Sequence, residues 1–162
     1  MNMKRMRGVY VVEFAIIGLC MFVLLFGVLE LGRLYFTVNA LNEVVRRGAR
    51  LAAVCTVSNA DIRQRAIFTA AGSAESSESP IIRGLESTDL IVTYLDEDGD
   101  TVSAPETTDF SDVRYVQVSI TGFSFRLLIP GFGEGFTLPE FRATLPRESL
   151  GYDGATEEPT EC

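Results

Sequence analysis

The sequence VYVVEFAIIGLCMFVLLFGVL occupies residues 9–29, and every residue in it except Glu13 is apolar or glycine. Its 21 residues match the length that an α-helix needs to cross the ~30 Å hydrocarbon core of a bilayer. Residues 1–8 are short and basic, with three Lys or Arg residues. The stretch therefore predicts one membrane-spanning helix at residues 9–29 behind a basic leader at residues 1–8.

Glu13 is the exception within the apolar stretch. A carboxylate inside a membrane costs about 2.5–3.5 kcal/mol, so such residues are rare and usually have a specific partner. Taken alone, Glu13 is explained by a position near the end of the span, from which its side chain reaches the headgroups. It follows Gly8 by five residues, however, and it directly precedes Phe14. This combination, behind a basic leader, is much more specific than any of its parts.

Residues 8–14, GVYVVEF, resemble a type IV prepilin processing site. The resemblance implies that a prepilin peptidase cuts after Gly8 on the cytoplasmic face and that Val9 becomes the mature N-terminus. It also implies that Glu13 acts in recruitment of the subunit and sets its register in the assembly. The helix from Phe14 onward would then pack in that assembly. A secretory signal peptide is the competing interpretation. It fits less well, because the apolar run is too long and no small-x-small cleavage site follows it.

Three motifs after the span narrow this resemblance. ELGR at residues 30–33, NAL at residues 39–41 and RGAR at residues 47–50 follow in that order. Over residues 7–53 the pattern resembles the TadE-like minor pilins (pseudopilins) of the tight-adherence, Flp-type IVb pilus system, more than a general-secretion pseudopilin. The resemblance implies a subunit in pilus initiation or assembly, with no cofactor. Its implied partners are the prepilin peptidase, other pilins or pseudopilins, the inner-membrane assembly platform and membrane lipid.

Cleavage after Gly8 would change the charge at the start of the span. It would remove three cationic side chains and create an amine on Val9, about one helical turn before Glu13. Glu13 could then pair with its own amine or with that of an adjacent subunit. A mismatched carboxylate is costly at low dielectric, so pairing between subunits would set the axial register of the packed helices. The resemblance favours this second arrangement.

Charge divides the chain into two parts. Residues 1–50 carry a net charge of +4 and residues 51–162 a net charge of −12. An acidic head argues against nucleic-acid binding, which requires a basic patch. Basic residues flank both ends of the span, so their distribution does not decide its orientation. The processing-site resemblance predicts a single-pass inner-membrane protein with its N-terminus in the cytoplasm and its head in the periplasm or outside. Incorporation into the pilus stays open.

The pattern of residues 30–57 predicts an amphipathic continuation of the helix, because apolar residues recur there at alternating spacings of three and four. This stripe consists of Leu31, Leu34, Val38, Leu41, Val45, Gly48, Ala52 and Cys55. It ends in small side chains, which allow a sheet to approach closely. On the opposite face, Glu43 and Arg47 are spaced to form an ion pair.

Residues 58–148 predict a small α+β head. A short helix follows an N-cap at Ser58 or Asn59 and ends at Ala71-Gly72, and a polar linker occupies residues 72–80. Strand patterns cover residues 90–95, 113–125 and 136–145, with an Asp-Gly turn at residues 96–100 and Pro139 at an edge. A meander of about three antiparallel strands would pack on the amphipathic part of the long helix, the arrangement that pilin resemblance also implies. Residues 149–162 predict a flexible acidic tail.

The three cysteines lie at positions 20, 55 and 162. Cys20 is explained as an apolar residue of the span. Cys55 and Cys162 would meet an oxidising compartment in an exported head, and could form a disulfide or remain two thiols. The chain has no histidine and no Cys-x-x-Cys motif, so no zinc site is predicted. The acidic stretch at residues 96–100 lacks the last glutamate of a calcium loop and is better explained as a turn.

Two other classes of function compete with the pilin hypothesis. A plain single-span envelope protein with an extracytoplasmic binding domain would keep its leader and would tolerate Glu13→Ala. A membrane-anchored enzyme would need catalytic residues. The head has no histidine, no glycine-rich phosphate loop and no nucleophile-and-base pattern. We therefore predict no catalytic residues.

Overall fold

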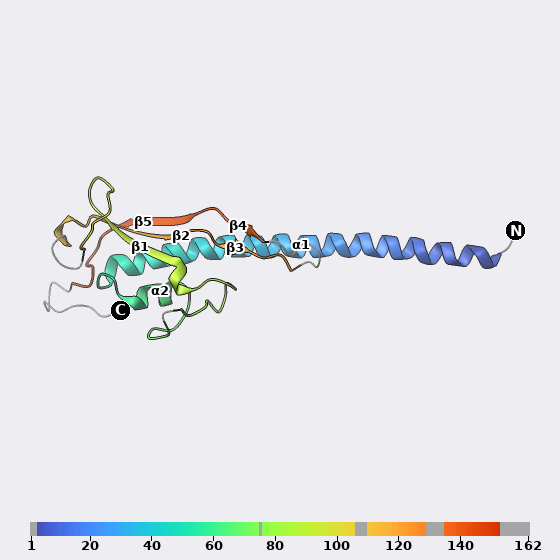
Figure 1. The fold of residues 1–162 in the computed structure, drawn as a ribbon, viewed down its shortest axis with the longest axis horizontal. Helices are drawn as coiled ribbons and strands as arrows, with labels where there is room; N and C mark the ends of the chain where they lie inside the picture. Colours follow the sequence, from blue (N-terminus) through green and yellow to red (C-terminus); the bar gives the residue numbers. More distant parts are fainter. Residues whose placement is uncertain (1–2, 75, 106–109, 129–134, 153–162) are drawn as a thin grey trace.

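The protein is a long helix with a small α+β head packed around its C-terminal half (Figure 1). The computed structural model describes residues 3–74, 76–105, 110–128 and 135–152. Helix α1 runs from Met3 to Val54. No proline interrupts it, since the first proline is Pro80. The predicted single continuous helix is confirmed.

The head contains a three-stranded antiparallel sheet in the order β1-β2-β5. Strand β1 is Leu90–Leu95, β2 is Tyr115–Ile120 and β5 is Phe141–Pro146. In this sheet Val118 lies opposite Val92 on one side and Ala143 on the other. Val116, Val118 and Ile120 are fully buried and form the inward face of β2.

A separate two-stranded hairpin lies closer to the apolar end of α1. It pairs β3, Ser124–Phe125, with β4, Phe136–Thr137. The sequence suggested that β3 continues β2. Gly122 instead has a φ of +71°, a left-handed conformation that separates the two strands. Leu138 N–H donates to the Phe123 carbonyl and joins the hairpin to the turn at 2.8 Å.

Helix α2, Ala60–Ala66, packs on α1, and the 3₁₀ helix η1, Ser87–Asp89, contacts α2. A second 3₁₀ helix, η2, is Phe110–Asp112. The predicted cap is confirmed, because the Asn59 side chain accepts from the Asp61 N–H at 2.8 Å. The helix ends earlier than expected, since Phe68 adopts a positive φ of 67°. The linker is also more ordered than expected: Ser79 is buried and its hydroxyl donates to the Ile67 carbonyl at 2.9 Å.

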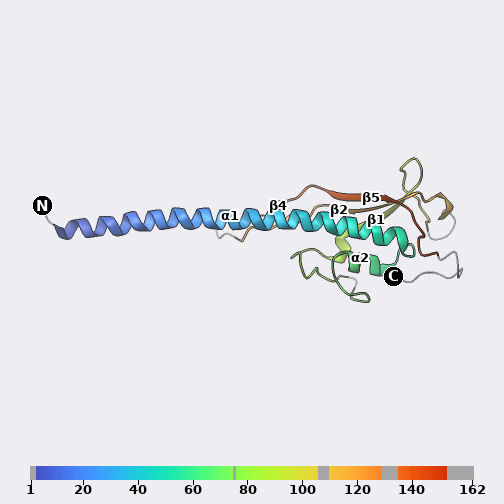
Figure 2. The same ribbon diagram turned by 180° about the vertical axis from the view of Figure 1, so that it is seen from behind.

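The sheet and α2 lie on different sides of α1, as both ribbon views show (Figure 2). Gly48 lies between them. A Cβ atom at this position would stand 3.2 Å from Val118 and 3.3 Å from Ala66. The absence of a side chain at Gly48 therefore lets both layers approach α1, as the sequence predicted for the sheet.

Two predictions for the second half of α1 are wrong, one on its apolar stripe and one on an ion pair of its opposite face. Leu41, Val45, Gly48, Ala52 and Cys55 are buried, but Leu31 is exposed because the sheet does not reach it. The ion pair predicted between Glu43 and Arg47 is not among the salt bridges of the described residues. The Arg47 guanidinium lies instead 5.0 Å from the ring centre of Phe68.

The predicted tail begins later than residue 149. Leu150 is buried and its N–H donates to the Ala53 carbonyl at 3.1 Å, and Gly151 N–H donates to the Val54 carbonyl at 2.6 Å. These bonds satisfy carbonyl groups at the C-terminus of α1, which have no partner within the helix. Residues 149–152 therefore cap α1, and the remaining residues 153–162 lie outside the described part of the chain.

Candidate functional site

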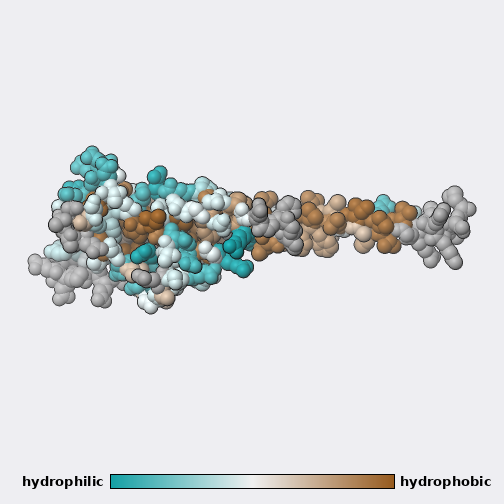
Figure 3. Space-filling view, viewed as in Figure 1, coloured by the Kyte–Doolittle hydropathy of each residue, from teal (hydrophilic) through white to brown (hydrophobic). Residues whose placement is uncertain are grey.

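No other part of the chain that the structure describes buries the side chains of residues 9–29 in α1. The large apolar side chains of this segment are all exposed, and Figure 3 shows them as brown atoms along the visible face of the projecting rod. Among the described residues, one helix is long and apolar enough to cross a membrane, and its most apolar window has no buried residue. A rod of this length and composition is suited to a lipid or protein environment rather than to water.

The residues of the predicted processing site lie together in the first turns of this rod. Gly8 lies within α1, and Val9, Glu13 and Phe14 are all exposed. Val9 and Glu13 are four residues apart and therefore lie on the same face of the helix. Within the described residues, no hydrogen bond or ion pair of Glu13 is found. The Glu13 carboxylate is thus available to a group outside this chain.

A second glutamate, Glu30, lies at the other end of the apolar rod in a different setting. Its side chain is about 10 % exposed, and its Oε2 atom forms an ion pair with Arg33 at 2.8 Å. Its Oε1 atom accepts a hydrogen bond from the Leu128 N–H at 2.7 Å. Leu128 is 98 residues further along the chain, beyond strand β3. Glu30 therefore fastens the hairpin to α1.

Arg33 completes this contact, which we call the Glu30 clamp: Glu30, Arg33 and the backbone of Arg126 and Leu128. The Arg33 guanidinium donates to the Arg126 carbonyl and lies 4.2 Å from the ring centre of Phe125. The rings of Phe125 and Phe136 are 5.6 Å apart and join the two strands of the hairpin. The clamp thus combines charge, backbone hydrogen bonds and a cation–π contact in one place.

The electrostatics of the clamp favour an ionised Glu30. Burial of the side chain raises its pKa, but the hydrogen bonds from Arg33 and Leu128 N–H and the positive charge of Arg33 lower it, and the net direction is down. Sequence reasoning used Glu30 and Arg33 only as part of a family motif. Their spacing of three residues on a helix was the available signal for the ion pair, whereas nothing in the sequence indicated the contact to Leu128.

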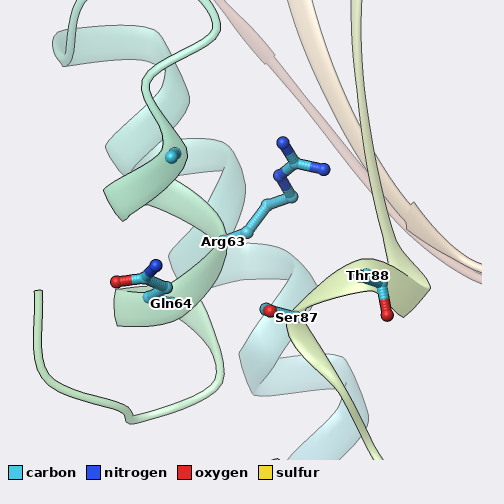
Figure 4. A pocket seen from close by; sticks show the side chains of 5 residues that line it. Arg63, Gln64, Ser87 and Thr88 are labelled. Atoms are coloured by element: carbon cyan, nitrogen blue, oxygen red, sulfur yellow. The ribbon is translucent and has the colours of Figure 1, made fainter. Parts of the chain in front are cut away.

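The head has two shallow grooves beside α2. The smaller, of about 110 Å³, is lined by residues of α2 and η1; Figure 4 shows the Arg63 side chain extending from α2, with Ser87 and Thr88 on η1. The larger, about 270 Å³, continues toward Tyr94. Both are smaller than the roughly 300–1,000 Å³ of typical small-molecule sites.

Metal-ligand groups do not gather in the described residues, where no cluster of three or more His, Cys, Asp or Glu side chains is arranged to hold a metal ion. The Asp96 carboxylate accepts from the N–H groups of Asp98 and Asp100 and shapes the turn, in which Gly99 has a φ of +88°. This geometry explains the acidic stretch as a turn.

The cysteines differ in their surroundings. Cys20 is a free, exposed thiol on the apolar rod, whereas Cys55 is buried at the end of α1 and is not free. Cys162 lies outside the described residues, so the bridge between Cys55 and Cys162 stays a prediction.

Comparison with known proteins identifies one family. The family model described as "TadE-like protein" matches residues 8–50. This segment contains Gly8, Glu13, the apolar rod, and Glu30 and Arg33 of the clamp. No curated protein matches the chain, and no solved structure matches it. Residues 8–50 of the chain are thus similar to the TadE-like protein family.

Proposed function

We propose that this protein is a minor pilin, or pseudopilin, that takes part in the initiation or assembly of a tight-adherence pilus after prepilin-peptidase cleavage. Similarity to the TadE-like family implies a role in biogenesis of the Tad pilus. The observation that carries the finer proposal is the N-terminal rod, which exposes its large apolar side chains and one carboxylate, Glu13, that has no partner among the described residues.

In this proposal the rod has two successive environments. Residues 9–29 first hold the protein in the inner membrane, with the head outside the cytoplasm. After cleavage behind Gly8, the new amine of Val9 lies one turn from Glu13. An adjacent subunit then offers its amine to Glu13, and the charge pair fixes the axial position of one helix against the next. The proposed partners are the peptidase, other pilins or pseudopilins and the membrane assembly platform.

Cleavage is tested by intact mass and N-terminal sequencing of the membrane-extracted protein, with and without the cognate prepilin peptidase. We expect a mature chain of 154 residues beginning at Val9, and full-length protein when Gly8 is replaced by leucine. A chain that keeps Met1 in the presence of an active peptidase would contradict the proposal.

Assembly is tested separately with Glu13→Gln, which removes the charge and keeps the size of the side chain. We expect normal cleavage and membrane insertion but loss of pili and of crosslinks to other pilins. Glu43→Gln is the matched control, because Glu43 is an exposed glutamate on the same helix beyond the apolar rod.

The alternative is a single-span envelope protein whose head binds a ligand, and the groove of about 270 Å³ beside α2 is the feature that favours it. It predicts an uncut leader and normal function of Glu13→Gln. Substitutions in the groove, such as Arg63→Ala, would then be the damaging ones.

A further inference from the structure

The Glu30 clamp fixes the position of the β3–β4 hairpin along the axis of α1, relative to the apolar rod. Glu30 directly follows Leu29, the last residue of the apolar stretch. On the proposed function, on which this inference rests, Glu30 therefore marks the boundary between hydrocarbon and headgroups. Because Leu128 N–H donates to Glu30 at 2.7 Å, the end of β3 lies at the same boundary.

Exposed apolar side chains surround α1 at this level. Leu128 is 62 % exposed beside Glu30, and on α1 Leu31, Tyr35 and Phe36 are 66 %, 73 % and 54 % exposed. Phe36 is six residues beyond Glu30, or about 9 Å along the axis. The headgroup layer is roughly 5–8 Å thick on each side of the hydrocarbon core, so these side chains lie within or near it. Aromatic residues are enriched at this depth.

The clamp satisfies two polar backbone groups in residues 126–128, directly after β3. Non-helical backbone at membrane depth is tolerated only where other protein groups bond to its N–H and C=O groups. Here the Leu128 N–H donates to Glu30 and the Arg126 carbonyl accepts from Arg33. The clamp therefore lowers the cost of taking these two backbone groups out of water, and the apolar side chain of Leu128 remains exposed beside them.

From these observations we propose that the β3–β4 hairpin is a lipid-binding element. Its clamped end, with Leu128, enters the boundary between headgroups and acyl chains of the membrane that α1 spans. Leu31, Tyr35 and Phe36 complete an apolar collar around the helix at that depth. The collar is continuous with the apolar rod, so the same lipid that surrounds residues 9–29 is its occupant. It holds the head at a set height above the membrane before assembly.

Depth-dependent fluorescence quenching of the full-length protein in phospholipid vesicles tests this proposal. An environment-sensitive label is placed on Leu128→Cys in a Cys20→Ser background. The control label is on Asp98→Cys, an exposed residue of the turn after β1, and Figure 1 shows that the loop after β1 lies at the end of the head away from the rod. The Cys20→Ser parent, treated in the same way, gives the blank. We expect the label at position 128 to be blue-shifted and quenched by lipids with a nitroxide high on the acyl chain, and the label at position 98 to be unaffected.

The clamp is tested in the same assay. Adding Glu30→Gln to the Leu128→Cys protein should reduce quenching at position 128, because the hairpin loses its ionic attachment to α1. Glu43→Gln, the matched change on the water-facing part of the helix, should leave quenching unchanged.

The native Cys20 separates the failure of this inference from the failure of the membrane proposal. If a label on Cys20 is quenched by lipid while the label at position 128 behaves like that at position 98, the anchor holds and the lipid-binding hairpin is wrong. Labels at position 128 could instead be blue-shifted, insensitive to nitroxide lipids and quenched by labels on other copies of the protein. A second copy would then cover the collar, and the inference would also be wrong. If Cys20 is not quenched, the anchor itself fails.

Discussion

The two halves of α1 have the same backbone conformation and opposite surroundings. Residues 9–29 expose apolar side chains on every face, whereas Leu41, Val44 and Ala49 in the second half are fully buried under the sheet and α2. The first half must therefore be covered by something outside the chain, and the second half is covered by the chain itself. The distribution of apolar residues around a helix, and not its hydrophobicity alone, indicates which of these applies.

The glutamates of the two halves show the same contrast. Glu13 is exposed without a partner in the described residues, and Glu30 is buried with an arginine and a backbone N–H. A carboxylate with its partners inside the chain stabilises the fold, whereas one without them is available for assembly. Cysteine, leucine, glycine and glutamate each occur both in the rod and in the rest of the chain. Four pairs of substitutions at these residue types test whether the two halves of α1 differ as the structure indicates.

The cysteine pair gives the largest expected effect. A bridge between Cys55 and Cys162 would close a loop of 107 residues and stabilise the head by about 4–5 kcal/mol on the chain-entropy model. Cys162→Ser should therefore lower the free energy of unfolding of the head by this amount, measured by urea titration of tyrosine fluorescence in detergent. Cys20→Ser in the rod should have no effect. An intact mass with three free thiols would show that no bridge exists.

The leucine pair compares a buried side chain with an exposed one on the same helix. Leu41 is 0 % exposed and Leu24 is 70 % exposed. Leu41→Ala should destabilise the head by about 2–5 kcal/mol, because it leaves a cavity under the sheet. Leu24→Ala should change the stability of the head by less than about 0.5 kcal/mol. Equal effects in the same urea titration would contradict the division of α1 into two environments.

The glycine pair tests how closely other elements approach α1 in its two halves. A side chain at Gly48 meets Val118 and Ala66, whereas no atom lies within 4 Å of a Cβ atom at Gly18. Gly48→Leu should cost about 1–3 kcal/mol, because β2 and α2 must both move away from α1. Gly18→Leu should leave the melting temperature of the head unchanged, and a similar loss there would mean that the rod is packed against the head.

The pH dependence of the Glu30 clamp gives the smallest effect. Because the folded pKa of Glu30 is lowered from 4.5, the clamp contributes stability above that value, and this contribution is lost as the pH falls through the lower folded pKa. Hydrogen exchange of the Leu128 amide should therefore be more protected near neutral pH than below the pKa of Glu30, after correction for the intrinsic rate. Glu30→Gln should abolish this difference, and Glu13→Gln should preserve it.

Much of the fold follows from local patterns in the sequence. The helix, its cap at Asn59, the strand at residues 90–95 and the inward face of β2 all depend on residues close together in the chain. The errors occur where a distant contact overrides a local pattern. Leu31 continues the apolar stripe but lies beyond the end of the sheet, and residues 149–152 stand at the start of an acidic, glycine-containing stretch but cap the C-terminus of α1.

The candidate site divides in the same way. The sequence alone predicts Gly8, Val9, Glu13 and Phe14 as site residues, because their spacing within seven residues forms the motif, and their roles stay a prediction. The role of Glu30 and Arg33 in holding the hairpin was missed, because their partners at Arg126 and Leu128 are more than ninety residues away. No periodicity or motif in either segment specifies the other.

By itself, the sequence determined that residues 9–29 form an apolar rod with one carboxylate, because composition alone decides whether every face of a helix is apolar. It also determined which face of residues 34–55 is covered, because the spacing of apolar residues follows the helical repeat. Only the tertiary structure decided that Gly122 separates the β3–β4 hairpin from β2 and that the segment after β3 meets Glu30. That contact depends on how the sheet packs on α1, which is a property of the whole head and not of any one segment.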